Sequence, residues 1–387
     1  MEVIYVSSLC SQSTYEYYIP NLNQRHNQQI QKYHNLMVRG LKENACHIKL
    51  ITTPPINRKV SSKRFLKGFK ETADGLTYQY LTVINIRLLK SIYFFISTFF
   101  LVLTKRLKSR HHIVVDALNI SSSMASLLAG KLTHQKVIAI VTDLPQMTPQ
   151  LEKKAPLIEK FMRYYDGFVF LSEPMNHVIN KKNKPFVVIE GQIDSEMQQV
   201  DNLLKNKFKK KTIMYAGRLD ERYGLDLLVN AFFQLSMVDV ELHLYGHGPY
   251  VTQLESIIEE SRNIVYHGIV TNQEVVDAQV RSTLLVNPRP TYENYTNYSF
   301  PSKNLEYMAS GTPILTTNIP SMPKDYRDFV FLIQDETVDG IHKALIHVLK
   351  LSAEDIHHKG LQAKEFVLKN KNNVHQSSKL LDLAKKI

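Results

Sequence analysis

Two charged side chains, Lys303 and Glu306, have the types and the spacing to bind a ligand that carries both phosphate and hydroxyl groups. They lie one turn apart on one face of a helix expected to begin near Ser302. A lysine in a first turn opposes the helix dipole unless an anion lies between it and the backbone, where free N–H groups suit phosphate. Glu306 can accept hydrogen bonds from vicinal hydroxyls such as those of a ribose. The alternative is that Lys303 is a solvated surface lysine.

The elements around this pair follow from local signals. Leu284 to Val286 is a short apolar strand that turns through residues 287–290 into a polar, tyrosine-rich loop. Gly311 stands where a helix ending at Ser310 needs a left-handed residue, and residues 313–317 form the next buried strand. The loop therefore lies at the carboxyl end of a strand, where open α/β sheets bind ligands.

The segment SFPSKNLEYMASGTPIL resembles the donor-site motif of family 4 glycosyltransferases, which have the two-domain GT-B fold. In that family two carboxylates are spaced Glu-x7-Glu, and the second holds the donor ribose. Glu306 matches the second carboxylate, whereas Tyr298 occupies the position of the first. The resemblance implies that Ser302, Lys303 and Asn304 also contact the donor. The PSK-x-x-EYM version resembles the branch found in bacterial capsule and exopolysaccharide gene clusters.

A second motif, Gly217-Arg218-Leu219, follows an apolar strand at residues 212–216. It resembles the family's donor-phosphate motif, whose arginine binds the diphosphate. Gly217 permits close backbone approach, and Arg218 supplies a forked donor for phosphate oxygens. The family has a lysine just before the next glycine, but Tyr223 stands there, so one expected cation is missing.

Two further loops carry candidate residues. The strand Val240 to Tyr245 runs into a loop in which Gly246 and Gly248 can pass close to a nucleobase or phosphate, or simply form a turn. Asp143 follows a strand at residues 137–141, where related enzymes place a histidine before the aspartate. Asp143 is either a polar contact on the acceptor side or a cap for the next turn.

Strands alternate with helices along the chain, which predicts parallel sheets with right-handed crossovers. With 387 residues, we expect an α/β protein with two Rossmann-like domains facing across a cleft, as in GT-B enzymes. Residues 54–80 read as an irregular connection, and a helix is expected from Asn21 to Glu43. The expected domains are 1–200 on the acceptor side, a solvated linker at 201–211, a nucleotide-sugar domain at 212–370, and a helix at 371–387 that crosses back to the first domain.

The stretch from Ile92 to Leu103 is nearly all apolar and has basic neighbours, namely Arg87, Lys90, Lys105, Arg106, Lys108 and Arg110. A transmembrane helix needs roughly 20 apolar residues, so a span is not expected. A buried domain helix and an interfacial helix on anionic lipid both fit the pattern. The amino terminus has no basic region of a secretory signal, and Cys10 and Cys46 have no metal spacing. We expect a cytoplasmic protein, peripheral on the inner face of the cell membrane if the helix is interfacial.

The resemblance implies a retaining transferase of the hexosyltransferase type that needs neither metal nor cofactor, since the nucleotide sugar is a substrate. Catalysis would rest on Arg218, Lys303 and Asp143. The expected partners are a nucleotide-sugar donor and a saccharide or lipid-diphosphate-saccharide acceptor. A nucleotide-sugar epimerase is the alternative within the enzyme class. The net charge of +12 raises nucleic-acid binding as a remote alternative, but the basic residues are scattered and no aromatic platform accompanies them.

Overall fold

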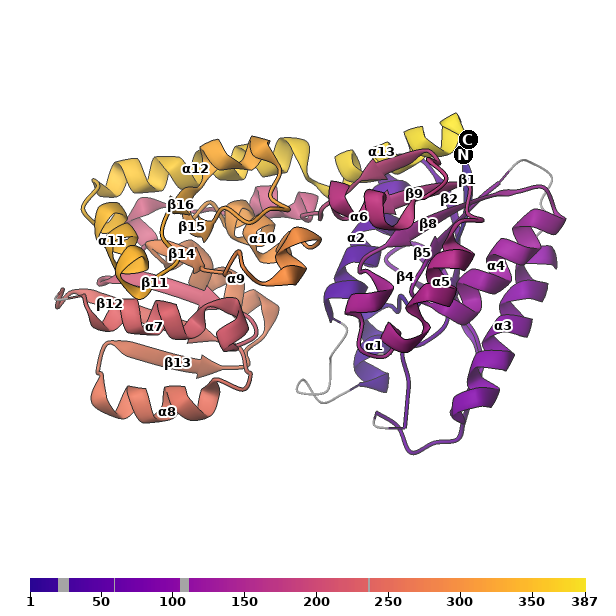
Figure 1. Cartoon of the computed structure of the whole chain (residues 1–387), viewed down its shortest axis with the longest axis horizontal. Coiled ribbons are helices and arrows are strands. Elements are labelled where there is room, and N and C mark those ends of the chain that lie inside the picture. The colour runs from indigo at the N-terminus through magenta and orange to yellow at the C-terminus, as the bar shows by residue number, and fades with distance from the viewer. Residues whose placement is uncertain (20–27, 59, 105–110, 236) are drawn as a thin grey trace. The chain divides into compact units, whose positions relative to one another are not determined.

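The computed structural model describes residues 1–19, 28–58, 60–104, 111–235 and 237–387 (Figure 1). The chain divides into two compact units, one made of residues 1–192 with 373–387 and the other of residues 193–372. Each unit is built on a largely or wholly parallel sheet between helices. The expected α/β class with two Rossmann-like units is therefore confirmed.

The first unit has an eight-stranded sheet in the order β10-β9-β8-β7-β1-β2-β5-β4. All neighbours pair in parallel except β4 and β5, which form an antiparallel hairpin at one edge. A separate two-stranded ribbon pairs β3 with β6. The strands are β1 (Glu2–Ser7), β2 (His47–Thr52), β3 (Phe65–Leu66), β4 (Lys70–Ala73), β5 (Leu76–Tyr80), β6 (Val83–Ile84), β7 (His112–Asp116), β8 (Lys136–Val141), β9 (Gly167–Phe170) and β10 (Phe186–Val188).

Helices cover this sheet because its central strands are apolar on both sides, and residues 3–6 of β1 are fully buried. Helix α13 packs against α2 on one face, and α4 packs against β1, β7 and β8 as well as against α3. The helices are α1 (Gln12–Tyr18), α2 (Gln28–Glu43), α3 (Arg87–Thr104), α4 (Ile120–Leu132), α5 (Ala155–Met162), α6 (Glu173–Ile179) and α13 (Asn373–Lys386). Residues 21–27 of the helix expected from Asn21 lie outside the described residues.

The second unit has a six-stranded, fully parallel sheet in the order β13-β12-β11-β14-β15-β16. The chain runs outward from β11 in one direction and then outward from β14 in the other, so the strand order reverses between these two strands. The strands are β11 (Lys211–Ala216), β12 (Val240–Tyr245), β13 (Ile264–Gly268), β14 (Leu284–Asn287), β15 (Ile314–Thr317) and β16 (Phe331–Ile333).

Alternation along the strands of the second unit gives it two cores. In β11, Ile213 and Tyr215 face α7, α8 and α11, whereas Met214 and Ala216 face α9, α10 and α12. The helices are α7 (Leu225–Phe233), α8 (Val251–Glu260), α9 (Asn272–Arg281), α10 (Ser302–Ser310), α11 (Val338–Leu349) and α12 (Ala353–Asn370). Helix α9 begins with a capping box between Thr271 and Glu274.

The unit boundaries differ from the expected ones. The first division falls after residue 192, and residues 201–211 pack on the second unit instead of forming a solvated linker. Asn202 donates to the Ser310 carbonyl, and the Lys207 amine donates to the Val280 and Ser282 carbonyls. Burial lowers the pKa of Lys207 to about 7. Buried polar groups that are paired in this way fix the segment in place.

Residues 54–80, expected to be irregular, contain the β4–β5 hairpin. Its turn is Asp74-Gly75, with both residues at positive φ. Leu76, Tyr78 and Tyr80 are buried in alternation along β5. An Asp-Gly turn followed by alternating burial is a hairpin signal that the expectation overlooked.

Candidate functional site

The second sheet brings two candidate loops together where its strand order reverses. Strands β11 and β14 are neighbours, with Ile213 paired to Leu284. Gly217-Arg218 follows the carboxyl end of β11, and Pro288-Arg289 follows the carboxyl end of β14. Such a reversal is where doubly wound sheets bind ligands.

Lys303 reaches this place from the first turn of α10. Only 8% of the residue is exposed. Its amine donates to the Tyr215 hydroxyl at 2.9 Å and lies 4.2 Å from the centre of that ring. Burial, assisted by the charge of Arg289, lowers the pKa of Lys303 well below its ordinary value, while the charge of Glu306 opposes this shift. The alternative of a solvated surface lysine is therefore wrong.

Gly217 makes room for that lysine. Its φ is +145°, and a Cβ built there would lie 1.8 Å from the Lys303 amine. Any other residue at position 217 would displace the lysine from Tyr215. The close approach that Gly217 permits in this structure is thus between the β11 backbone and a cation.

Arg218 points its side chain toward solvent, with 57% of it exposed. Its Nε donates to Asp220 at 3.0 Å. An exposed ion pair contributes only about 0–1 kcal/mol, so this pairing can be exchanged for a phosphate at little cost. The Arg218 carbonyl accepts a hydrogen bond from the Tyr215 hydroxyl, which ties this loop to the contact of Lys303.

Arg289 is a cation that the sequence reading missed. Its guanidinium lies 4.7 Å from the centre of the Tyr223 ring and 5.7 Å from that of Tyr295. Its Nε is buried and has no hydrogen-bond partner within the described part of the chain. The charge of Arg289 contributes to lowering the pKa of Lys303, so the two side chains interact electrostatically. The sequence signal that could have identified Arg289 was its position, two residues after the carboxyl end of strand β14.

Tyrosines form the wall around these cations. Tyr223 and Tyr295 meet edge to face at 5.9 Å, and the Tyr295 hydroxyl donates to the Arg222 carbonyl. Burial is the main cause that raises the pKa of Tyr295 to about 12 and that of Tyr215 well above its ordinary value. The rings therefore stay neutral and offer the cations their faces.

The other residues of α10 have separate surroundings. The helix begins at Ser302 after Pro301, and no side chain caps its first turn. Glu306 is partly exposed one turn later. Asn304 is only 1% exposed, and its amide bonds to Asn287 and Thr316 of the neighbouring strands. That geometry supports a structural role for Asn304 and gives no support to donor contact.

Gly246 and Gly248 are explained by the packing of neighbouring loops. A Cβ at Gly246 would lie 1.9 Å from the Gly217 carbonyl oxygen, and one at Gly248 would lie 2.0 Å from that of Leu219. The backbone of Leu219 also donates to the His247 carbonyl at 3.1 Å. The two glycines let the loops after β11 and β12 touch, so the turn interpretation accounts for both of them.

Asp143 lies in the first unit, after β8. Although its side chain reaches solvent, protein atoms crowd it, and this desolvation together with the charge of Asp116 raises the pKa of Asp143 to about 6. The 3₁₀ turn that follows begins at Pro145 after Leu144 and has no side-chain cap. Asp143 therefore does not cap that turn.

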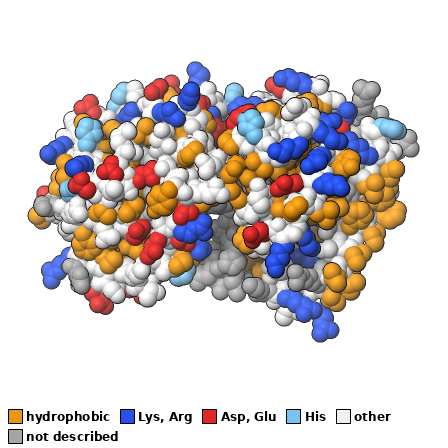
Figure 2. Space-filling model, in the orientation of Figure 1, with side chains coloured by type: hydrophobic (Ala, Val, Ile, Leu, Met, Phe, Trp, Pro, Cys, Tyr) orange, Lys and Arg blue, Asp and Glu red, His pale blue; other side chains and the backbone are white. Residues whose placement is uncertain are grey.

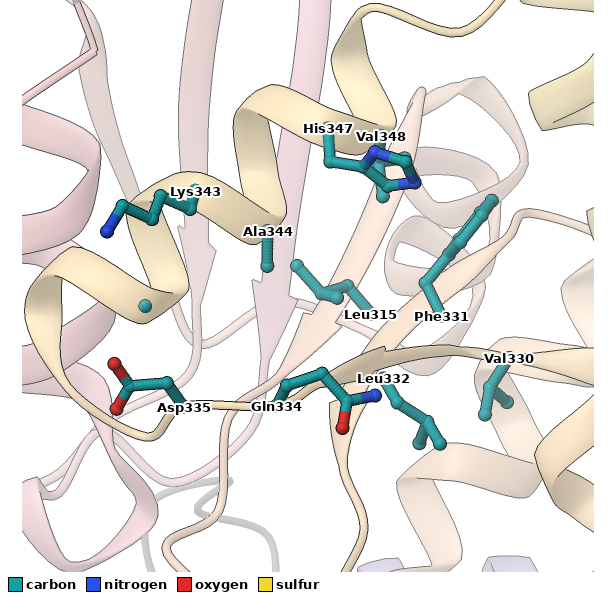
Figure 3. A pocket seen from close by; sticks show the side chains of 11 residues that line it. Leu315, Val330, Phe331, Leu332, Gln334, Asp335, Lys343, Ala344, His347 and Val348 are labelled. Carbon is teal, nitrogen blue, oxygen red and sulfur yellow. The ribbon is translucent and has the colours of Figure 1, made fainter.

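Two further features of the described residues bear on the site. Within the described residues, no group of three or more His, Cys, Asp or Glu side chains is arranged to hold a metal ion. A hollow of about 740 Å³ lies between β16 and α11 (Figure 3), lined by Leu315, Val330, Phe331, Leu332, Gln334, Asp335, Gly340, Lys343, Ala344, His347 and Val348. Its lining includes none of the candidate residues.

Comparison with known proteins identifies a matching family and one relative of the chain. Residues 210–351 match the family described as Glycosyl transferases group 1. An uncharacterized 41.2 kDa protein in the cps region of Klebsiella pneumoniae is 24% identical over 257 residues, which cover 60% of this chain and 68% of that protein.

Solved structures resemble the whole chain. The E. coli trehalose-6-phosphate protein bound with UDP-2-fluoro glucose has a TM-score of 0.72 at 11% identity, covering 100% of this chain and 99% of that one. The lipopolysaccharide outer core galactosyltransferase WaaB has a TM-score of 0.65 at 12% identity over the same shares. Anabaena HepE, in complex with UDP and glucose, has a TM-score of 0.63 at 10% identity and covers 100% of both chains. The whole chain therefore has the GT-B fold, and its residues 210–351 belong to the group 1 glycosyltransferases.

Proposed function

We propose that this enzyme transfers a sugar, with retention, from a nucleotide-sugar donor to a lipid-diphosphate-linked saccharide during synthesis of a cell-surface polysaccharide. Among its structural relatives, HepE binds UDP and glucose, and the E. coli protein binds UDP-2-fluoro glucose. The relative from Klebsiella pneumoniae belongs to a cps region. These properties support a uridine nucleotide as the first donor to test.

The observation that carries the proposal is the pairing of Arg289 with Lys303. Burial among the tyrosines, and secondly the charge of Arg289, disfavour the protonated form of Lys303 and lower its pKa. A diphosphate bound beside both side chains would pair with Arg289 and favour the protonated form of Lys303. The site is thus prepared for an anion before the anion arrives.

Donor recognition follows from the surrounding groups. Arg218 would exchange its bond to Asp220 for a phosphate oxygen. The uncapped first turn of α10, beginning at Ser302, offers backbone N–H groups to the same phosphates. Glu306, one turn further on, would accept hydrogen bonds from the ribose hydroxyls.

In the proposed reaction, the acceptor hydroxyl oxygen bonds to the anomeric carbon on the face from which the diphosphate leaves. The bond from that carbon to the phosphate oxygen breaks, and the leaving phosphate takes the acceptor proton. Arg289, Lys303 and Arg218 stabilise the charge that develops on the diphosphate, which supplies the neutralisation without a resident metal ion. Asp143 is proposed to orient the acceptor from the first unit.

Binding and turnover test this proposal separately. Uridine, guanosine and adenosine diphosphate sugars are titrated by calorimetry, and acceptor mass is measured after incubation with each donor that binds. Transfer adds one sugar residue to the acceptor, whereas an epimerase would change the donor without an acceptor. Binding of no nucleotide sugar in the panel, or donor isomerisation without an acceptor product, would overturn the proposal.

An acceptor carried on lipid implies work at the inner face of the cell membrane, and we propose a cytoplasmic, peripheral location. No described helix is long and apolar enough to cross a bilayer.

A further inference from the structure

Helix α3 has one packed face and one bare apolar face. Phe94, Thr98 and Val102 are buried at intervals of four residues, and the Thr98 hydroxyl bonds to Ser122 of α4. The opposite face exposes Leu88, Leu89, Ile92, Ile96 and Phe100. These side chains form a continuous stripe, since four of them recur every fourth residue. Leu88 is 76% exposed and Phe100 is 56% exposed, so no described element covers either end of the stripe.

A basic and aromatic loop is fixed beside the amino end of this helix. Residues 61–70, here called the basic loop, expose Lys63, Arg64, Lys67 and Lys70 together with Phe65 and Phe69. Strand β3 in this loop pairs with β6, which leads directly into α3. The Asn85 amide donates to the carbonyls of Ser61 and Lys63, so the loop is held at the start of α3.

Charge of one sign dominates this region. The sequence has no acidic residue from position 56 to 70 and none between Asp74 and Asp116. Figure 2 shows hydrophobic side chains gathered along the edge of the first unit over α3, with Lys and Arg side chains beside them at its lower end. The Lys90 amine donates to the Ile56 carbonyl, and burial lowers its pKa, so Lys90 is not counted among the exposed basic side chains. Lys105, Arg106, Lys108 and Arg110 lie outside the described residues.

We propose that the bare face of α3 and the basic loop together form a docking surface for an anionic lipid bilayer. The apolar stripe would enter the boundary between headgroups and acyl chains, while the four basic side chains contact the negative headgroups. The segment from position 56 to 70 carries basic but no acidic side chains, and this charge complements an anionic surface. The proposed lipid-linked acceptor explains only why docking would be useful to the enzyme, because docking to a bilayer needs no substrate.

Sedimentation with vesicles tests the surface without donor or acceptor. We expect the full chain to bind phosphatidylcholine vesicles that contain phosphatidylglycerol, and high salt to weaken this binding. Ile92→Ser/Phe100→Ser should reduce partitioning roughly tenfold or more, because it removes two buried contacts with the bilayer. Lys63→Gln/Lys67→Gln/Lys70→Gln should remove the preference for phosphatidylglycerol over phosphatidylcholine alone.

Matched variants keep the test specific. Leu157→Ser/Tyr164→Ser changes one exposed aliphatic and one exposed aromatic residue elsewhere in the first unit. Lys153→Gln/Lys154→Gln/Lys182→Gln removes three exposed lysines from other surfaces. Both controls should bind vesicles as the parent does, and thermal unfolding should show that every variant is folded.

Several outcomes would overturn the proposal. One is that the parent does not bind anionic vesicles. Another is that the variants of the docking surface bind vesicles as well as the control variants do. If the parent sediments as a dimer and the Ile92→Ser/Phe100→Ser variant as a monomer, with vesicle binding unchanged, the stripe is an interface between copies. Because nucleotide-sugar binding is measured separately, loss of vesicle binding with donor binding intact would reject this inference and leave the proposed function standing.

Discussion

The guanidinium of Arg289 lies over the ring of Tyr223, 4.7 Å from its centre. Tyr223 occupies the position at which the related enzymes are expected to carry a lysine, so the neighbouring strand supplies a cation where the first one is missing. The charge comes from the loop after β14 instead of the loop after β11.

This relationship predicts the behaviour of Arg289 variants. Arg289→Ala should lower kcat on the order of a hundredfold, since removing a single group that stabilises developing negative charge costs about 2.7–4 kcal/mol. Arg289→Lys should recover part of the loss. Arg222→Ala, which removes a nearby but exposed arginine, should change kcat by less than about fivefold. Equal effects at positions 289 and 222 would contradict the assignment.

Lys303 should combine a large effect on rate with an unusual effect on stability. Lys303→Ala is expected to reduce kcat roughly a hundredfold, with partial recovery in Lys303→Arg. The folded state binds fewer protons than the unfolded chain because the pKa of Lys303 is lowered. Stability of the parent should therefore rise with pH up to the ordinary lysine value near 10.4. Lys303→Met should lack this component of the rise, which urea unfolding at several pH values can measure.

Glu306→Gln should weaken donor binding roughly tenfold or more while leaving the fold intact, because a charge-assisted hydrogen bond contributes about 1.5–3 kcal/mol. Glu354→Gln, on the exposed first turn of α12, is the matched control and should bind donor normally. Calorimetry with the nucleoside diphosphate alone should show the same difference. An unchanged Kd in Glu306→Gln would remove Glu306 from the donor site.

Asp143 predicts a feature of the pH profile. With its pKa raised to about 6, the carboxylate forms only above that pH, so kcat/KM should fall as pH drops through about 6. Asp143→Asn should lower kcat/KM and abolish that limb. Ionisation between about pH 4 and 6 disfavours the folded state, so the parent should lose stability across this window as pH rises, and the asparagine variant should not. A limb that persists in Asp143→Asn would assign it to another group.

Asn304 should behave as a structural residue. Asn304→Ala leaves the buried amide of Asn287 without its partner, which should cost about 1–3 kcal/mol of unfolding free energy. The donor Kd of the folded fraction should stay within about twofold of the parent. A large loss of donor affinity at unchanged stability would instead support the contact expected from the motif.

Local signals accounted for most of the elements that position the site. The apolar run before Asn287, the lysine and glutamate one turn apart, and Gly311 at positive φ all read correctly from sequence. These features depend on a few neighbouring residues, so a short segment specifies them. The Asp74-Gly75 hairpin had an equally local signal and was overlooked.

Contacts between segments that are distant in sequence could not be predicted. Arg289 and Tyr223 meet only because β11 and β14 are neighbours in the sheet. The sequence left Gly246 and Gly248 open to either a ligand contact or a turn, and their close packing against the loop after β11 appears only in the structure. The burial of Lys303 depends on Gly217, which lies far from it in sequence. Each of these facts is a property of the strand order.

The last helix has a consequence for how the chain comes to be folded during synthesis. Leu380 and Leu383 of α13 are buried in the first unit, yet they leave the ribosome after the whole of the second unit. The second unit is contiguous and can finish folding while the first still lacks part of its core. A released chain that ends at residue 372 should therefore protect residues 193–372 from protease better than it protects residues 1–192.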